Sequence, residues 1–392
     1  MAINPQIQED RDYLISLRRH FHQYPELSMK EYNTAKRIEK ELHQIGVKTR
    51  RIGETGVLGV IEGNGSSDRI VALRADIDAL HIQDVKTVDY ASIIPGVMHA
   101  CGHDSHTTAL IGAARYLKAN EAKLDGKVYL IFQQGEEYGQ GARLFIKEGL
   151  LNNAYRVFGI HVDSEIPVGK VAIKEGPVNA SVDHFTIKIK GISSHVSTPH
   201  KGVDGLYIAA QTVIALQGIV SRLTDPKDVV VVGVGVLKAG EGYNIVAKEA
   251  VIEGTTRCFT EKIRDRTNRK IEEISKNIAS IYGGEAEIIF QDFTSPLVND
   301  KTSCEEVRIV AEKIVGKDNI VSREATLGGD DFAEFLKITK GMYAYVGTGN
   351  PDKPNTLAAL HGDNFDIDEE AIIIGANLYA DYAMSQLAFI CQ

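Results

Sequence analysis

The sequence has few cysteines, and no two of them stand at the CxxC spacing of a metal or redox motif. The four are Cys101, Cys258, Cys304 and Cys391. In a reducing compartment a structural disulfide is not expected among residues so widely separated. Only Cys101 has neighbours that suggest chemistry, and the other three are expected to be small core or surface residues.

Excess positive charge and long apolar runs are also lacking. The chain has 44 Lys and Arg against 53 Asp and Glu, a net charge of −9, which gives it no electrostatic reason to bind nucleic acid or an anionic membrane. No apolar run reaches the roughly 18–20 residues of a membrane helix. The first residues, MAINPQIQEDRDY, lack the basic and apolar regions of a signal peptide. We therefore expect a cytoplasmic protein without a nucleic-acid or membrane partner.

The length of 392 residues suits two domains better than one compact core. In the first part, short β-rich runs (57–61, 70–73, 128–132 and 157–160) alternate with helical stretches such as 107–117. Near the end, an apolar strand at 343–346 precedes a closing helix near 369–384. This alternation predicts an α/β domain with a mainly parallel sheet, whose carboxyl edge is where sites gather.

The middle of the chain has a different pattern. Its predicted order is β-α-β-β-α-β, the order of a ferredoxin-like α+β unit: strand 185–190, helix 205–222, strands 229–236 and 249–258, helix 261–282 and strand 285–290. We predict a lid domain at residues 180–292, inserted into a catalytic domain formed by residues 1–179 and 293–392. The half-solvated strand at 185–190 could pair across a dimer.

The densest group of reactive side chains is HACGHDSH, from His99 to His106. A polar loop with incidental histidines is the plainer alternative. Imidazole and thiolate favour borderline-soft divalent ions, and on an extended segment Cys101 and His103 point to the same side. Asp104 or Ser105 could cap the helix that follows. The motif therefore indicates a metal site.

Further polar side chains follow predicted strands. They are Glu136 and Glu137 in QQGEE, His161 in GIHVD, His361 in ALHGDNFD, and Asp76 and Asp78 in ALRADIDAL. Alone, the glutamates could form a solvated acidic turn, and a single histidine could be structural. Of two adjacent carboxylates, one can bind a metal while the other faces substrate. The alternating aspartates could orient a ligating histidine.

Together with GGDDF (328–332) and RRHFHQYPELS near the N-terminus, these motifs in this order resemble the M20 metallopeptidases. The resemblance is to the amidohydrolase subfamily, which includes hippurate hydrolases, N-acyl-amino-acid amidohydrolases and auxin-conjugate hydrolases, and it covers nearly the whole chain. Arg74 stands where the broader family has a metal-binding histidine, and the thiolate of Cys101 replaces a bridging aspartate. The chain follows the subfamily pattern in both respects.

The resemblance implies a di-metal catalytic domain and a smaller lid domain. It implies two divalent ions, which would be zinc, manganese, cobalt or nickel. The implied metal ligands are Cys101, His103, Glu137, His161 and His361. The resemblance further implies that Glu136 is the general base, that His195 stabilises the oxyanion, and that Asn244 and Arg257 bind the substrate. The planar guanidinium of Arg257 matches the free carboxylate of an N-acyl amino acid in two-point geometry.

The predicted reaction is hydrolysis of the amide bond of an N-acyl amino acid, as in an aminoacylase, releasing a carboxylic acid and a free amino acid. A metallo-dipeptidase or aminopeptidase of the same fold is the nearer alternative, although no acidic group for a substrate amine is identifiable. A non-catalytic metal-dependent binding protein would need a missing base or ligand, and none is missing. A homo-oligomer is left open.

Overall fold

The computed structural model describes residues 2–389, which form two compact units. Unit 1 contains residues 2–176, 299–324 and 330–389, and unit 2 contains residues 177–298 and 325–329. Each unit has its own buried apolar cluster. The assignment of the two units as catalytic domain and lid stays a prediction.

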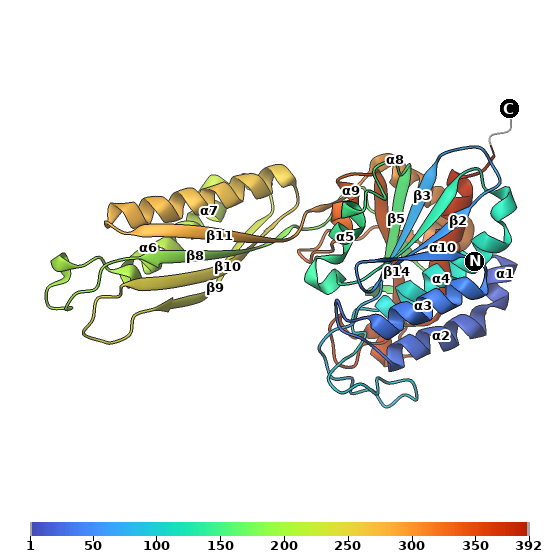
Figure 1. The fold of residues 1–392 in the computed structure, drawn as a ribbon, viewed down its shortest axis with the longest axis horizontal. Coiled ribbons are helices and arrows are strands. Elements are labelled where there is room, and N and C mark those ends of the chain that lie inside the picture. The colour runs from blue at the N-terminus through green and yellow to red at the C-terminus, as the bar shows by residue number, and fades with distance from the viewer. Residues whose placement is uncertain (1, 390–392) are drawn as a thin grey trace. The chain divides into compact units, whose positions relative to one another are not determined.

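Unit 1 is built on an eight-stranded sheet (Figure 1). In spatial order its strands are β1 (Lys48–Ile52), β2 (Gly56–Glu62), β4 (Lys127–Gln133), β3 (Ile70–Asp76), β5 (Arg156–Pro167), β14 (Gly341–Gly349), β6 (Val171–Ala172) and β13 (Ile320–Val321). The sheet is mixed: β4, β3, β5 and β14 run parallel at its centre, whereas β1, β2 and β6 make antiparallel pairs. The predicted α/β class is confirmed, and its parallel part holds the strand ends that carry the polar motifs.

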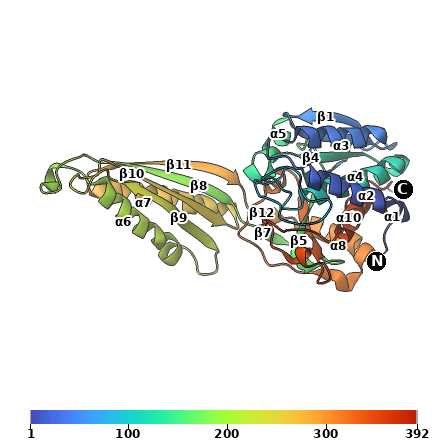
Figure 2. The same ribbon diagram turned by 90° about the horizontal axis from the view of Figure 1, so that it is seen from below.

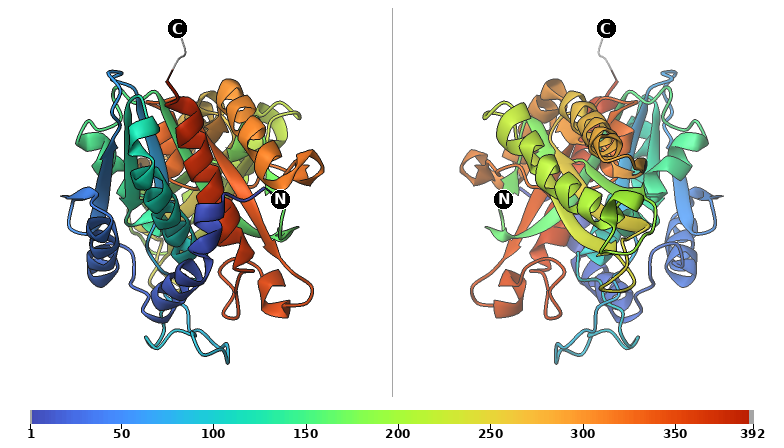
Figure 3. Two further views of the ribbon diagram at one scale, coloured as in Figure 1. Left: turned by 90° about the vertical axis from the view of Figure 1, so that its right-hand side faces the viewer. Right: turned by 90° about the vertical axis from the view of Figure 1, so that its left-hand side faces the viewer.

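Helices cover this sheet, and two of them, α4 (His103–Ala119) and α10 (Glu370–Gln386), lie side by side (Figure 3, left). Most residues of these two helices are buried, since each packs on the sheet and on its neighbour. The remaining helices of unit 1 are α1 (Pro5–Glu9), α2 (Arg11–Gln23), α3 (Tyr32–Gln44), η1 (Glu121–Lys123), η2 (Glu136–Tyr138), α5 (Gly141–Lys147), α8 (Lys301–Val315), η5 (Lys317–Asn319), α9 (Phe332–Leu336) and η6 (Pro354–Leu357).

Unit 2 is a four-stranded antiparallel sheet with two long helices on one face (Figure 2; Figure 3, right). Along the chain it consists of β8 (Val182–Lys190), η3 (Pro199–Lys201), α6 (Gly205–Gly218), η4 (Ile219–Leu223), β9 (Val230–Ala239), β10 (Glu249–Cys258), α7 (Glu261–Ile281) and β11 (Glu285–Thr294). The spatial order β11-β8-β10-β9 is that of a ferredoxin-like unit, so this prediction is confirmed. A separate two-stranded sheet pairs β7 (Gly176–Asn179) with β12 (Leu297–Asn299).

The prediction that residues 185–190 pair across a dimer is wrong. These residues belong to β8, which is bonded to β10 on one side and to β11 on the other. A strand paired on both sides has no free backbone groups for another chain. The edges of this sheet are β9 and β11.

Among the described residues one helix, Gly205–Leu223, is long and apolar enough to cross a membrane by length and composition. Its 18-residue window has a mean hydropathy of 1.3, although Gln211 and Gln217 interrupt the apolar run. Ile208 and Leu216 on this helix belong to the core of unit 2, as expected for a helix packed on a sheet. The sequence expectation concerned an unbroken apolar run, and the two glutamines keep this helix short of one.

Candidate metal centre

The HACGHDSH motif turns sharply before it becomes a helix. Cys101 lies in a turn, Gly102 has a left-handed backbone (φ 83°), and His103 begins α4. A Cβ at position 102 would lie 2.4 Å from Cγ2 of Val162, so no side chain fits there. The predicted extended segment is therefore wrong: a glycine turn, and not strand alternation, brings Cys101 and His103 to one place.

The start of α4 also differs from the prediction. Its N-cap is Gly102, without a side-chain cap, so neither Asp104 nor Ser105 has that role. The carboxylate of Asp104 accepts instead from Nε of the buried Arg18 at 2.8 Å. The hydroxyl of Ser105 donates to the carbonyl of Gly102 at 2.5 Å. Asp104 and Ser105 thus stabilise the turn at Gly102 through these hydrogen bonds.

Glu136 and Glu137 follow β4 and form the short helix η2. Gly135, with φ 60°, makes the turn that separates them from the strand. Oε1 of Glu137 lies 3.4 Å from Nε2 of His361 and 4.0 Å from Nε2 of His103. Glu136 is buried, and its carboxylate also approaches those of Asp330 and Asp331. Oε2 of Glu136 also lies 4.0 Å from Nε2 of His103, so the two glutamates share this neighbour and differ in their others.

The two remaining histidines reach the same place from distant parts of the chain. His161 lies within β5, opposite Tyr345 of β14, and not at the end of a strand as the sequence suggested. Its Nε2 lies 3.4 Å from Sγ of Cys101. His361 lies in a loop with φ 65°, and its backbone N–H donates to the carbonyl of Ala100 at 2.8 Å.

All five side chains expected to bind metal come together in unit 1. Cys101, His103 and His161 form one group of three donor atoms within 4.8 Å of one another, and Cys101, Glu137 and His361 form a second. Cys101 belongs to both groups. Two overlapping groups with one shared thiol could hold two neighbouring ions. Three further groups of donors adjoin them: Asp76 with His103 and His106, His103 with Glu136 and Glu137, and Glu136 with Asp330 and Asp331.

The donor atoms fit a metal by their hydrogen bonding as well. Among the described residues, Nε2 of His103 and Oε1 of Glu137 are buried without a hydrogen-bond partner. Nδ1 of His103 donates to the carbonyl of Asp78 at 3.0 Å, and Nδ1 of His161 donates to that of Val162 at 2.7 Å. Both imidazoles thus carry the proton on Nδ1 and present the Nε2 lone pair to the centre. Leaving such atoms unpaired is costly, and a cation would satisfy them.

The other two histidines of HACGHDSH are not placed as ligands. His106 donates from Nδ1 to Asp76 at 2.6 Å and accepts at Nε2 from the backbone N–H of Val162 at 3.0 Å, so both nitrogens are occupied. His99 is buried and belongs to none of the groups of donor atoms among the described residues. Burial lowers the pKa of His99 to about 4, so it is neutral near pH 7.

The electrostatics of the site favour positive charge at His361 and His103, whereas burial and the neighbouring His106 hold the pKa of His161 well below its usual value. The neighbouring side chains of Cys101 and Glu137 raise the pKa of His361 to about 10. Burial opposes a charge on His103, but the carboxylate of Asp76 and the thiol of Cys101 raise its pKa well above the usual value. Without a metal, His103 and His361 therefore carry the positive charge that a bound ion would otherwise supply.

Glu136 has the environment of a proton carrier. Burial raises its pKa well above the usual value, and the negative charges of Asp330 and Glu137 raise it further. A carboxyl group tuned upward in this way can take and return a proton near neutral pH. The predicted division between Glu136 as base and Glu137 as ligand agrees with these surroundings.

The sequence interpretation assigned no role to a buried charge network beside Glu136. The guanidinium of Arg74 donates to Asp76 at 2.6 Å, to Asp331 at 3.1 Å and to Gln133 at 2.9 Å. Arg74, at the position of the broader family's metal-binding histidine, neutralises these carboxylates. The adjacent aspartates of GGDDF were the available signal, but only the fold places them beside β3 and β4.

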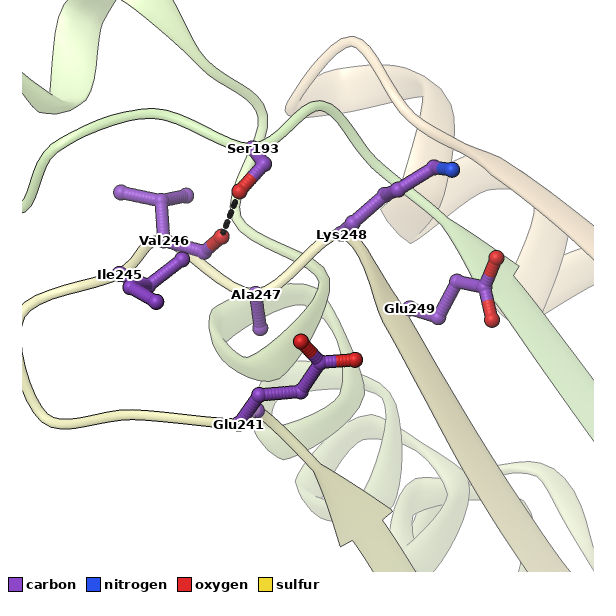
Figure 4. A pocket seen from close by; sticks show the side chains of 8 residues that line it. Ser193, Glu241, Ile245, Val246, Ala247, Lys248 and Glu249 are labelled. Atoms are coloured by element: carbon purple, nitrogen blue, oxygen red, sulfur yellow. Dashed lines mark hydrogen bonds between the residues drawn. The ribbon is translucent and has the colours of Figure 1, made fainter.

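Two of the expected substrate-binding residues meet in the loops of unit 2. The backbone N–H of Val196 donates to the carbonyl of Asn244 at 3.1 Å, and His195 pairs with Ile245. Nδ1 of His195 accepts from the backbone N–H of Ser197 at 3.1 Å. The ring proton of His195 is therefore on Nε2, which is the donor that an oxyanion needs. A pocket of about 210 Å³ beside these loops is lined by residues including Ser193 and Glu241 (Figure 4).

Arg257 lies at the opposite end of unit 2 from this pair. It is in β10, eight residues after Glu249, where the strand leaves the loop that carries Asn244. Eight residues of strand span roughly 26 Å. Arg257 is half-buried and donates to Oγ1 of Thr255 at 3.0 Å. Within one unit 2, therefore, His195 and Asn244 are not brought together with Arg257.

An α/β unit with thiol, imidazole and carboxylate donors gathered around a buried glutamate defines a metallohydrolase. A match to Peptidase family M20/M25/M40 extends over residues 72–385. The chain belongs to this family.

Named relatives and solved structures agree with this assignment. The chain is 40% identical to N-acetyl-L-cysteine deacetylase of Bacillus subtilis over 92% of its length and 85% of the relative's. It is 36% identical to thermostable carboxypeptidase 2 of Saccharolobus solfataricus over 95% of both. The structure of a dinuclear metal binding peptidase from the M20 family of Bacillus subtilis, 33% identical, superposes with a TM-score of 0.84 and covers 97% of this chain and 99% of that one.

The predicted family resemblance and enzyme class are therefore confirmed, and the chain is a metal-dependent hydrolase of the amidohydrolase type.

Proposed function

We propose that this protein hydrolyses the amide bond of N-acyl amino acids, with two divalent ions held by Cys101, His103, Glu137, His161 and His361. The observation that carries the proposal is the convergence of these donors, two of them without a hydrogen-bond partner, beside the buried Glu136. The two ions would polarise the substrate carbonyl and lower the pKa of water. A thiolate, three imidazoles and a carboxylate suit zinc, manganese, cobalt or nickel.

Glu136 takes the proton of the attacking water and returns it to the leaving amine nitrogen. Its burial and the negative charge of Asp330 favour the protonated form between these two transfers. Glu137, one residue on, is directed to His103 and His361 and keeps its carboxylate for the metals. Adjacent carboxylates can thus perform different tasks because their neighbours differ.

His195 and Asn244 stabilise the reacting carbonyl, and Arg257 binds the free carboxylate of the substrate. Nε2–H of His195 is the available donor, because Nδ1 is occupied by Ser197. Among the described residues, the planar guanidinium of Arg257 hydrogen-bonds only to its strand neighbours Thr255 and Thr256. Arginine matches a carboxylate in two-point geometry, which lysine does not.

The relatives favour an amide next to a free carboxylate. N-acetyl-L-cysteine, named for one relative, is an N-acyl amino acid, and a carboxypeptidase, named for another, cuts the last amide of a peptide. Both substrates place a carboxylate beside the scissile bond, so carboxypeptidase activity is the second candidate. A dipeptidase or aminopeptidase would instead need a group that binds a free amine.

We expect wild-type enzyme to hydrolyse N-acetyl and N-benzoyl amino acids much faster than plain dipeptides. Arg257→Ala should raise KM for the N-acyl amino acid by about 10-fold or more, since a charge-assisted hydrogen bond contributes roughly 1.5–3 kcal/mol. KM for the matching N-acyl amino amide, which lacks the charge, should change little. An equal loss on acid and amide would show that Arg257 does not bind the carboxylate, and a preference for plain dipeptides would refute the proposed substrate class.

Arg257 lies roughly 26 Å along β10 from the loop that carries Asn244, and this separation bears on how copies of the chain assemble. An N-acyl amino acid is too short to touch Arg257 and Asn244 of one unit 2 at the same time. We propose that the protein is a homo-oligomer in which one substrate is bound by Arg257 of one copy and by His195 and Asn244 of another. The edge strand β9, with exposed Leu237, is a free surface for such pairing.

Mixing His195→Ala with Arg257→Ala protein, after co-expression or subunit exchange, should then restore turnover of N-acyl amino acids with the low KM of wild type, which neither variant shows alone. Statistical mixing of dimers leaves one intact site in each mixed dimer, about a quarter of all sites. His195→Ala mixed with Asn244→Ala is the control, because both residues come from the same copy and no intact site can form. Absence of recovery in mixed dimers of proven composition would contradict the shared site.

A further inference from the structure

Residues 28–31, which we call the brace segment, contact the turn that carries Glu136 and Glu137. They lie between α2 and α3, far from that turn in sequence. Oε1 of Glu31 accepts from the backbone N–H of Gly135 at 2.9 Å. The hydroxyl of Ser28 donates to Oδ2 of Asp78 at 2.6 Å, and the same oxygen accepts from the backbone N–H of Glu137 at 3.0 Å.

The brace segment is strained where it meets this turn. Only two non-glycine residues of the described chain have positive φ, Met29 (63°) and His361 (65°). His361 is among the proposed ligands, and Met29 packs on Gly135, where an added Cβ would lie 2.5 Å from Sδ of Met29. Backbone strain is retained where the surroundings hold it and concentrates at functional sites.

The carboxylate of Glu31 is fully buried, and both of its oxygens are used. Oε1 also accepts from the backbone N–H of Met29 at 2.8 Å, so one oxygen bonds both the strained residue and the turn. Oε2 accepts from the hydroxyl of Thr55 at 2.6 Å. Burying a carboxylate is costly, and no partner of Glu31 is a cation, so stability alone is a poor explanation for this choice of residue.

We propose that Glu31 is a positioning residue that sets the direction of Glu136 and Glu137 by fixing the backbone of Gly135. This role rests on the proposed function, because it concerns the placement of the base and of one metal ligand. Since Gly135 immediately precedes Glu136, a shift of its N–H rotates the start of η2 and both side chains with it. Outer residues that orient metal ligands commonly change metal affinity or activity roughly 10- to 100-fold when they are replaced.

The test compares Glu31→Ala with a matched buried glutamate, Glu41. Glu41 is on α3, is also buried, and accepts from Tyr13 and from Arg37, not from the turn. Glu31→Ala should weaken zinc or manganese binding, measured by competition with a chelator, by about 10-fold or more and lower kcat while KM stays near wild type. Glu41→Ala should lower thermal stability without changing metal affinity.

Glu31→Gln is the conservative variant. Its amide oxygen can accept from Met29 and Gly135 while its NH₂ donates to Oγ1 of Thr55, so metal affinity should recover to within about threefold of wild type. Glu31→Asp, which is one methylene shorter, should resemble Glu31→Ala and replaces it if the alanine variant does not fold.

The proposal is overturned if Glu31→Ala and Glu31→Asp bind metal as wild type does, or if Glu41→Ala weakens binding equally. Metal affinity is measured without substrate, so it separates this inference from the proposed function. If wild type hydrolyses no N-acyl amino acid and Glu31→Ala still loses metal affinity, the substrate assignment fails and the positioning role stands. If wild type hydrolyses N-acyl amino acids and Glu31→Ala keeps the metal affinity of wild type, the substrate assignment stands and the positioning role fails.

Discussion

Replacing Glu136 with Gln should lower kcat by about 10²- to 10⁴-fold, the usual contribution of a general acid–base residue. The amide keeps the shape of the side chain but cannot accept the proton of water. Because Glu136 is not among the proposed ligands, both metals should remain bound. Steady-state kinetics together with elemental analysis of the same preparation give the two measurements.

The neighbouring substitution is the control for this experiment. Glu137→Gln should weaken metal binding, since its carboxylate lies near His103 and His361. Turnover by Glu136→Gln close to that of wild type would contradict the assignment of the base. The pH dependence of wild type should agree with it: as the pH falls below the raised pKa of Glu136, the carboxyl is protonated, cannot act as base, and kcat falls.

Replacing Cys101 with Ser should remove most of the bound metal and most of the activity. The thiol is buried, and burial with the charge of Glu137 raises the pKa of Cys101, so an adjacent cation is needed to stabilise the thiolate. A serine hydroxyl stays protonated under the same conditions and is a poor ligand. Since Cys101 belongs to both groups of donors, the loss should affect both ions and exceed the roughly 10- to 100-fold effect of an outer partner.

Cys304→Ser is a matched control, because Cys304 is also a buried free cysteine of unit 1 but lies in α8 against the carbonyl of Lys174. It should keep its metals and its activity. Metal content at the wild-type level in Cys101→Ser, measured by elemental analysis, would refute the ligand assignment. Ligand protonation should also weaken metal binding in acid, and a chelator should lower both activity and melting temperature.

The family resemblance of the sequence motifs was sufficient to predict the side chains that gather in unit 1. Each of Cys101, Glu137, His161 and His361 belongs to a short polar motif next to an apolar run, and parallel strands bring such motifs to one region. The order of elements in unit 2 was equally predictable, because its strands alternate and its helices have a helical period. Local pattern determines the order of elements in unit 2, whereas the motifs identify the expected metal ligands through the family resemblance.

The resemblance named His103 as the ligand in HACGHDSH, but only the tertiary structure shows why His106 is not one. His106 is occupied by Asp76 and by the backbone of Val162, partners 30 and 56 residues away, whereas His103 keeps Nε2 unpaired. Three further features could not be predicted from the sequence. Asp330 lies beside Glu136, Glu31 contacts Gly135, and Arg257 lies far from Asn244. Sequence periodicity reports which face of an element is buried, but hydrogen-bond partners and burial of charge depend on contacts between segments far apart in the chain.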